Sequence, residues 1–130
     1  MIPLMALTEG RPLTEAKAEL FKALAHPARV RVLELLAEGE HTMGELAALS
    51  GFELSHLSQH VSTLRRAGIV DSRRVRTTVV CTLRDLQTAE LLGVARRLIG
   101  ANLRRDQALQ DALDNADDAV AAVDTGRVSA

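Results

Sequence analysis

The sequence predicts a mostly α-helical domain that carries a single β-hairpin. Hydrophobic residues fill 47% of the 130 positions, but the only aromatic residues are Phe21 and Phe52, so Leu, Val and Ala must form the core between helices. Apolar residues recur every three or four positions along most of the chain, as they do on one face of a helix. Between Ile69 and Leu83 the spacing changes to about two and β-branched residues dominate, which is typical of paired strands.

The first helix is expected to begin at Thr14, because Thr is a favourable N-cap, and to end near Leu24. Residues 1–12 hold two of the three prolines and show no apolar period, so they are expected to form a flexible arm. One domain fits the length of the chain.

A second helix is predicted from Pro27 to Glu38. Proline disfavours a helical conformation in the residue before it and fits the first turn of the helix after it. Gly39 is expected to end this helix. His26 could be a metal ligand, but a histidine beside a helix-start proline is expected to make a local hydrogen bond instead.

A short third helix follows Thr42, where Glu45 three residues later completes a capping pattern. Its residues Leu46, Ala47 and Leu49 are expected to face inward. The turn Ser50-Gly51-Phe52 then leads into a further helix. Two helices joined by a tight glycine turn form a helix-turn-helix arrangement.

The segment from Glu53 to Gly68 is the most informative part of the chain. Its predicted buried stripe consists of Leu54, Leu57, Val61 and Leu64. The opposite face holds Ser55, His56, Ser58, Gln59, Ser62, Arg65 and Arg66. These side chains can contact base edges and phosphates, which predicts a helix that enters a DNA major groove. The alternative is a solvated surface helix.

The predicted hairpin has a basic tip. Arg73, Arg74 and Arg76 lie at or beside the turn, and a helix-turn-helix followed by such a hairpin is a winged helix. These three Arg would reach phosphate or the minor groove, whereas the alternative is an ordinary solvated hairpin.

Charge is unevenly distributed, although the net charge is only −1. From Ser55 to Arg84 six Arg face one acid, Asp71, whereas from Asp106 onward acids dominate. The local balance therefore fits nucleic-acid binding better than the total does.

Three segments resemble a known family. They are LFKALAHPARVRVLELLAEG, TMGELAALSG and HLSQHVSTLRRAGIVDSRRVRTTVVCTL. Across about residues 18–100 they closely resemble the ArsR/SmtB family of bacterial winged-helix repressors. The resemblance implies a mostly α winged helix-turn-helix of four helices, two strands and a long last helix. It also implies a homodimer, formed through the first and last helices, that binds double-stranded operator DNA and leaves it when an effector binds.

The resemblance places base or phosphate contacts at Leu54, Ser55, His56, Ser58, Gln59 and His60. Together with the residues reasoned above, the predicted DNA-binding set is Leu54, Ser55, His56, Ser58, Gln59, His60, Ser62, Arg65, Arg73, Arg74 and Arg76. Glu53 departs from the family, which often has Ser or Asn at that helix start, and its carboxylate would face phosphate.

The metal ligands familiar in this family are missing. The third helix contains no Cys, and residues 85–113 contain no His. The single cysteine, Cys81, is expected to be a structural thiol on a wing strand. We therefore expect no metal and no cofactor. A small organic effector, or none at all, remains open.

The last helix carries a heptad pattern. From Leu92 to Val123, ten positions spaced alternately by three and four hold eight apolar residues, interrupted by Asn102 and Asp106. The pattern predicts a dimer seam, and the alternative is intramolecular core. The expected organisation is a winged-helix domain at 13–104, followed by a helical extension and acidic tail at 105–130.

The predicted function is a dimeric, sequence-specific transcriptional repressor that binds an inverted-repeat operator. The alternative is a winged-helix protein-interaction or regulatory subunit that lacks specific DNA binding. An enzyme is not expected, because we find no phosphate-binding glycine loop, nucleophile motif or catalytic carboxylate pair. No apolar run is long enough to span a bilayer, so we expect a cytoplasmic protein with no membrane partner.

Overall fold

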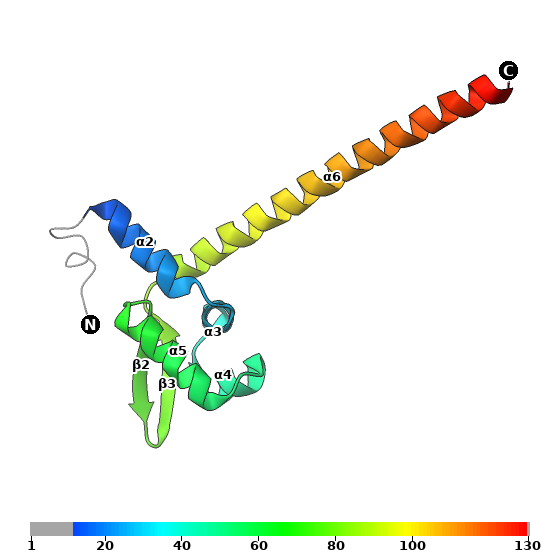
Figure 1. Ribbon diagram of the computed structural model, residues 1–130. Coiled ribbons are helices and arrows are strands. Elements are labelled where there is room, and N and C mark those ends of the chain that lie inside the picture. The colour runs from blue at the N-terminus through cyan, green and yellow to red at the C-terminus, as the bar shows by residue number, and fades with distance from the viewer. Residues whose placement is uncertain (1–11, 130) are drawn as a thin grey trace. The chain divides into compact units, whose positions relative to one another are not determined.

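The computed structural model describes the backbone of residues 12–129 and the side chains of residues 12–117 (Figure 1). Its elements are α2 (Leu13–Leu24), α3 (Pro27–Glu38), β1 (His41–Thr42), α4 (Met43–Ser50), α5 (Leu54–Arg66), β2 (Val70–Val75), β3 (Thr78–Leu83) and α6 (Gln87–Ser129). The chain divides into two compact units, Met1–Leu92 and Gly93–Ala130. The predicted mostly helical fold with one hairpin is confirmed. The expected arm at residues 1–12 lies outside the described residues, except for Pro12.

Helix α2 begins one residue before Thr14, because Pro12 stands at its N-cap position. The Pro12 carbonyl accepts the backbone N–H groups of Glu15 at 3.0 Å and Ala16 at 3.3 Å, and no side chain caps the helix. Thr14 lies inside the first turn, so the predicted Thr cap is wrong. The pattern favoured Thr14 because Thr is a good N-cap, but the fixed φ of proline also suits a helix start.

Helix α3 has the predicted bounds. His26 is its N-cap residue, and the Nδ1 atom of His26 accepts the Ala28 backbone N–H at 3.0 Å. The local hydrogen bond expected of His26 is thus confirmed. Gly39 ends the helix and donates its N–H to the Leu36 carbonyl at 3.2 Å.

Helices α4 and α5 form the helix-turn-helix. The Oγ1 atom of Thr42 accepts the Glu45 N–H at 3.0 Å, as the capping pattern predicts. Gly51 ends α4 with a φ of 78° and donates its N–H to the Ala47 carbonyl at 3.0 Å. Residues with a Cβ rarely adopt this left-handed conformation, so glycine permits the sharp turn here.

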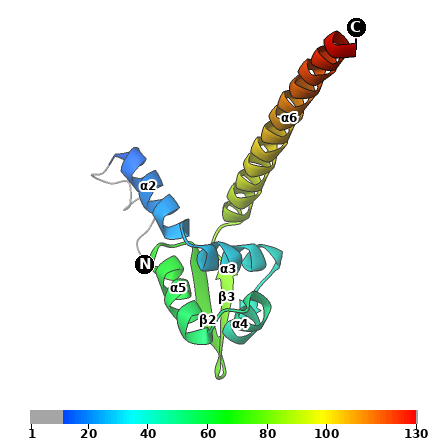
Figure 2. The same cartoon turned by 45° about the vertical axis from the view of Figure 1, so that its right-hand side comes forward.

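Strands β2 and β3 form the predicted antiparallel hairpin, whose tip is Arg76-Thr77. This hairpin is the wing, and in Figure 2 its tip points away from α3. Strand β1 pairs with the other edge of β3 and places His41 opposite Cys81, so the strand order is β1-β3-β2. We did not predict β1, because two residues are too few to show a strand period.

The core of the first unit lies between α3, α4, α5 and the sheet. Its completely buried large side chains are Val32, Leu33, Leu46, Leu57, Leu64, Val70 and Cys81. Two residues expected to face inward are instead exposed, Leu49 by 52% and Leu54 by 54%. Leu49 is in the last turn of α4 and Leu54 is the first residue of α5, so both flank the interhelical turn. The buried stripe of α5 therefore begins at Leu57.

Within the second unit, residues 93–129 continue α6 as an unbroken helix. The long last helix is therefore confirmed. Its exposed large apolar side chains are Val94, Leu98, Ile99, Leu103, Leu109 and Leu113. In the described part of the chain, no helix combines the length and the apolar character needed to cross a membrane.

Candidate nucleic-acid interface

Helix α5 turns a polar face to solvent while it buries Leu57, Val61 and Leu64. The predicted contact residues exposed on this face are Leu54, Ser55, His56, Ser58, Gln59 and Arg65, and two more, His60 and Ser62, are half-buried. Hydroxyl, amide and guanidinium groups arranged along one helix can hydrogen-bond to base edges and phosphates. The arrangement suits a helix that lies in a nucleic-acid groove.

An open groove follows the same face toward the end of α5. Its lining residues are Ser58, Gln59, Ser62, Thr63, Arg65 and Arg66. The predicted binding set did not include Thr63 or Arg66. Thr63 Oγ1 donates to the Gln59 carbonyl at 3.1 Å, and Arg66 lies 3.5 Å from the same hydroxyl. Arg66 is named on the polar face in the sequence analysis but was left out of the predicted set, and Thr63 follows the predicted contact residue Gln59 by four positions, a spacing that could have found it.

His60 differs from the other predicted contact residues in its surroundings. Its ring packs against His26, with the ring centroids 4.2 Å apart and the planes inclined by 42°. Burial lowers the pKa of His60, and the neighbouring basic groups of His26, Arg29 and His56 lower it further.

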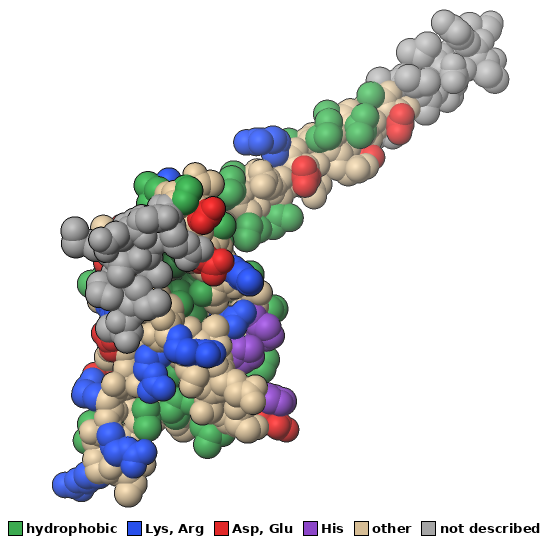
Figure 3. All heavy atoms as spheres, turned by 60° about the vertical axis from the view of Figure 1, so that its left-hand side comes forward, with side chains coloured by type: hydrophobic (Ala, Val, Ile, Leu, Met, Phe, Trp, Pro, Cys, Tyr) green, Lys and Arg blue, Asp and Glu red, His purple; other side chains and the backbone are tan. Residues whose placement is uncertain are grey.

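The wing carries Arg73, Arg74 and Arg76 in exposed positions. Arg73 forms an ion pair with Glu40 at 2.9 Å. Within the part of the chain that the structure describes, Arg74 and Arg76 have no hydrogen bond or ion pair. Figure 3 shows basic side chains from the lower tip, where the hairpin ends, upward across this face. Two of the three wing cations are thus available to an external anion.

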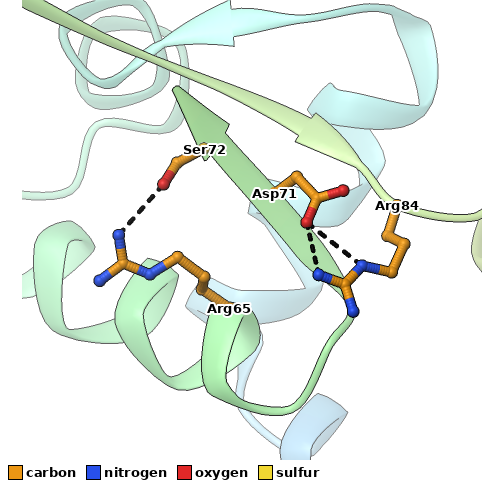
Figure 4. Close-up of polar contacts among 4 residues, drawn as sticks. All are labelled: Arg65, Asp71, Ser72 and Arg84. Carbon is orange, nitrogen blue, oxygen red and sulfur yellow. Dashed lines mark hydrogen bonds and ion pairs between the residues drawn. The ribbon is translucent and has the colours of Figure 1, made fainter. Parts of the chain in front are cut away.

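Two further Arg side chains hold the hairpin in place (Figure 4). Arg65 of α5 donates to Ser72 Oγ of β2 at 3.1 Å. Arg84 donates to the Asp71 carboxylate from both Nε, at 3.2 Å, and a terminal nitrogen, at 2.6 Å. Both bonds go to the same oxygen, Oδ1, and this ion pair compensates the charge of the single acid of the basic segment.

The carboxylate of Glu53 lies at the start of α5. It is exposed and 3.9 Å from the Nδ1 atom of His56, and it makes no side-chain cap for the helix. A negative charge at this end of the helix interacts favourably with the helix dipole.

The single thiol, Cys81, is completely buried, and its burial raises its pKa. Its Sγ atom lies 3.6 Å from the sulfur of Met43. Among the residues that the structure describes, no three His, Cys, Asp or Glu side chains gather to hold a metal ion.

The comparison with protein families matches residues 26–72 to the arsR family of bacterial regulatory proteins. This span covers α3, the helix-turn-helix and the start of the wing. The chain is 48% identical over 92 residues to an uncharacterized HTH-type transcriptional regulator, Rv0081, of Mycobacterium tuberculosis, covering 70% of this chain and 81% of the relative. It is 42% identical over 91 residues to the biofilm growth-associated repressor of Agrobacterium fabrum, covering 70% and 75%.

Solved structures agree with these sequence matches. The crystal structure of Rv0081 superposes with a TM-score of 0.66 at 47% identity, covering 72% of this chain and 94% of that one. The solution structure of the homodimeric winged helix-turn-helix DNA-binding domain of Mb0332 from Mycobacterium bovis gives a TM-score of 0.64 at 28% identity, covering 70% and 84%. The chain belongs to the ArsR family of bacterial winged helix-turn-helix transcriptional regulators.

Proposed function

We propose that this protein is a dimeric, sequence-specific repressor that places α5 in the major groove of operator DNA and the wing on the adjacent backbone. The observation that carries the proposal is the exposed polar face of α5 next to the unpaired cations Arg74 and Arg76. A surface helix with no binding role would not require unpaired cations beside its polar face. We propose that the protein acts on DNA in the cytoplasm. The proposed function includes no catalytic step.

The two parts of the interface have different proposed roles. Ser58 and Gln59 are short polar side chains that can exchange hydrogen bonds with base edges, so they would discriminate between sequences. Arg74 and Arg76 would neutralise phosphates, which are the same in every sequence, so they would contribute affinity without specificity.

The dimer is proposed to form through α2 and α6. In α2 the apolar side chains of Leu13, Leu20 and Phe21 are exposed by 39% to 57% in the single chain. In α6 the exposed apolar residues include Leu98 and Ile99. Transfer of such surface out of water is favourable by about 25 cal/mol for each Å², and this gain opposes the entropy cost of association. A similar chain, Mb0332, is described as homodimeric, which supports the proposal.

The experiment is a mobility-shift titration with the DNA upstream of the protein's own gene, compared with a scrambled duplex. Arg74→Ala should weaken binding to both duplexes and reduce the slope of log affinity against log salt by about one for each phosphate that is no longer neutralised. Gln59→Ala should weaken binding to the specific duplex by roughly 1–3 kcal/mol and change binding to the scrambled one little.

Arg31→Ala is the matched control, because Arg31 is an exposed arginine of α3 that pairs with Glu34 at 3.8 Å outside the proposed interface. It should leave both affinities unchanged. If the wild-type chain bound neither duplex above the level of a neutral protein, the alternative of a winged-helix interaction subunit would replace the proposal. The exposed carboxylate of Glu53 at the start of α5 is the observation that favours this alternative.

Release by an effector is also proposed, and a small organic molecule is the class we expect. The only thiol is buried at Cys81, and the described side chains gather no metal-binding group of three or more. An apolar ligand could bind among the exposed apolar side chains of α2 or of α6. Addition of candidate ligands to the mobility-shift assay would detect such release.

A further inference from the structure

The His26–His60 ring contact joins α3 to α5. His60 lies on α5, within the proposed DNA-binding face, and His26 precedes α3. His26 is held by its own backbone surroundings, since its Nδ1 atom accepts the Ala28 N–H at 3.0 Å and Pro27 follows it. The His60 ring therefore rests, with a centroid separation of 4.2 Å, on a partner that cannot easily move.

The surroundings of this pair are basic. The Nε atom of Arg29 is buried and, among the described residues, has no hydrogen-bond partner. His56 lies one turn before His60 on α5. These two residues and His26 are the charged groups that lower the pKa of His60, after the effect of its burial. Helix α2 also packs against α5 but contributes no group to this shift. The nearest acid on α5, Glu53, lies beside His56.

We propose that His26 is a positioning residue for helix α5, and that protonation of His60 against His26 in acid weakens DNA binding. This rests on the proposed function. A proton on His60 sets a cationic ring against His26 and Arg29. This repulsion loosens the contact through which the start of α3 orients the outer face of α5.

The lowered pKa of His60 gives the direction of the effect on the stability of the fold. Because the folded chain takes up the His60 proton less readily than the unfolded chain, the pair stabilises the fold fully above the ordinary histidine pKa of about 6.5. This contribution is lost as the pH falls through that value toward the lower pKa of the folded state. A simple phosphate contact by His60 would act oppositely, since DNA would favour the protonated ring and binding would strengthen in acid.

The test measures DNA affinity by fluorescence anisotropy from pH 7.5 to 5.5, with the full chain and the duplex upstream of its gene. His60→Phe keeps a flat ring that cannot take a proton. His26→Asn keeps an N-cap acceptor but removes the ring. His41→Gln is the control, because His41 bonds to Glu45 at 2.9 Å, away from the pair. Wild type and His41→Gln should lose affinity severalfold as the pH falls, and the other two variants should lose markedly less.

A second measurement uses the free protein. Titration of the imidazole C–H signals by NMR should place the midpoint of His60 below the ordinary histidine value, and His26→Asn should raise that midpoint because a neighbouring positive group is removed. Tighter wild-type binding in acid, or an undiminished acid loss in His60→Phe, would overturn the proposal. If the chain bound DNA at no pH, the proposed function would fail. In the free protein, a His60 midpoint unmoved by His26→Asn would separately overturn the coupling.

Discussion

Arg76 combines a strained backbone conformation with a proposed phosphate contact. Its φ of 59° lies in the left-handed region, and no other non-glycine residue in the described part of the chain has a positive φ. This conformation costs an L-residue with a side chain roughly 1–2 kcal/mol. Glycine would fit the tip of the wing better, and the proposed phosphate contact gives a reason for an arginine there.

Arg76→Gly should therefore change stability and DNA binding in opposite directions. The free energy of unfolding should rise by up to ~1 kcal/mol, since relief of strain exceeds the entropy cost of glycine. DNA affinity should fall, because a cation that we propose to bind phosphate is removed. Urea unfolding and a mobility-shift titration measure the two effects. Arg76→Ala is the matched control, which should lower affinity without raising stability.

For single residues, the sequence predicted local hydrogen bonds more accurately than it predicted which side chains are buried. The local hydrogen bond of His26 and the cap formed by Thr42 follow from rules that act within four residues, and both were predicted, whereas the predicted cap at Thr14 was wrong. The inward placement of Leu49 and Leu54 was wrong, because helical periodicity does not show where a neighbouring element stops covering the helix. The His26–His60 contact joins residues 34 positions apart, and no local rule indicates it.

At the scale of elements, the turn between α4 and α5 sets the direction in which α5, the proposed DNA-binding helix, leaves α4. Gly51 adopts a φ of 78° there, and a Cβ built on it would meet no atom within 4 Å. The penalty for a side chain at this position is therefore conformational and not steric.

Gly51→Ala should lower the free energy of unfolding by about 1–2 kcal/mol. Gly44→Ala is the control within the same helix, because Gly44 has no positive φ and an added Cβ would lie 3.9 Å from Thr42 Oγ1, an ordinary contact. The control should be neutral or stabilising by up to ~1 kcal/mol. Thermal or urea unfolding of both variants would test this, and equal losses in both would contradict the conformational explanation.

The order of the main elements was predictable from the sequence, since period and turn residues differ clearly between the helices and the hairpin. The partners of individual side chains were not. Charge counting along the chain treats Arg84 and Arg73 as free basic residues, but Arg84 pairs with Asp71, and Arg73 pairs with Glu40 across 33 positions. Such pairs depend on the tertiary arrangement of the sheet and the helices, which charge counting does not describe.

At the scale of the whole molecule, the net charge is only −1, but basic and acidic side chains lie in different parts of the chain. The proposed DNA interface is basic, whereas the described acids Asp106, Asp111, Asp114 and Asp117 lie together along α6. The amide groups of Gln107 and Gln110 bond to Asp111 and Asp114, one turn further along. A protein of this kind can bind DNA through one surface while its overall charge stays near zero.

A nuclease footprint of the protein on the DNA upstream of its gene tests the central claim most directly. Two identical α5 helices related by a two-fold axis require an inverted repeat, with half-site centres about one helical turn apart or a multiple of it. We predict protection of two such half-sites, with flanking backbone protection that disappears in Arg74→Ala. Protection of a single half-site or of a direct repeat would contradict the dimeric, two-fold mode of binding.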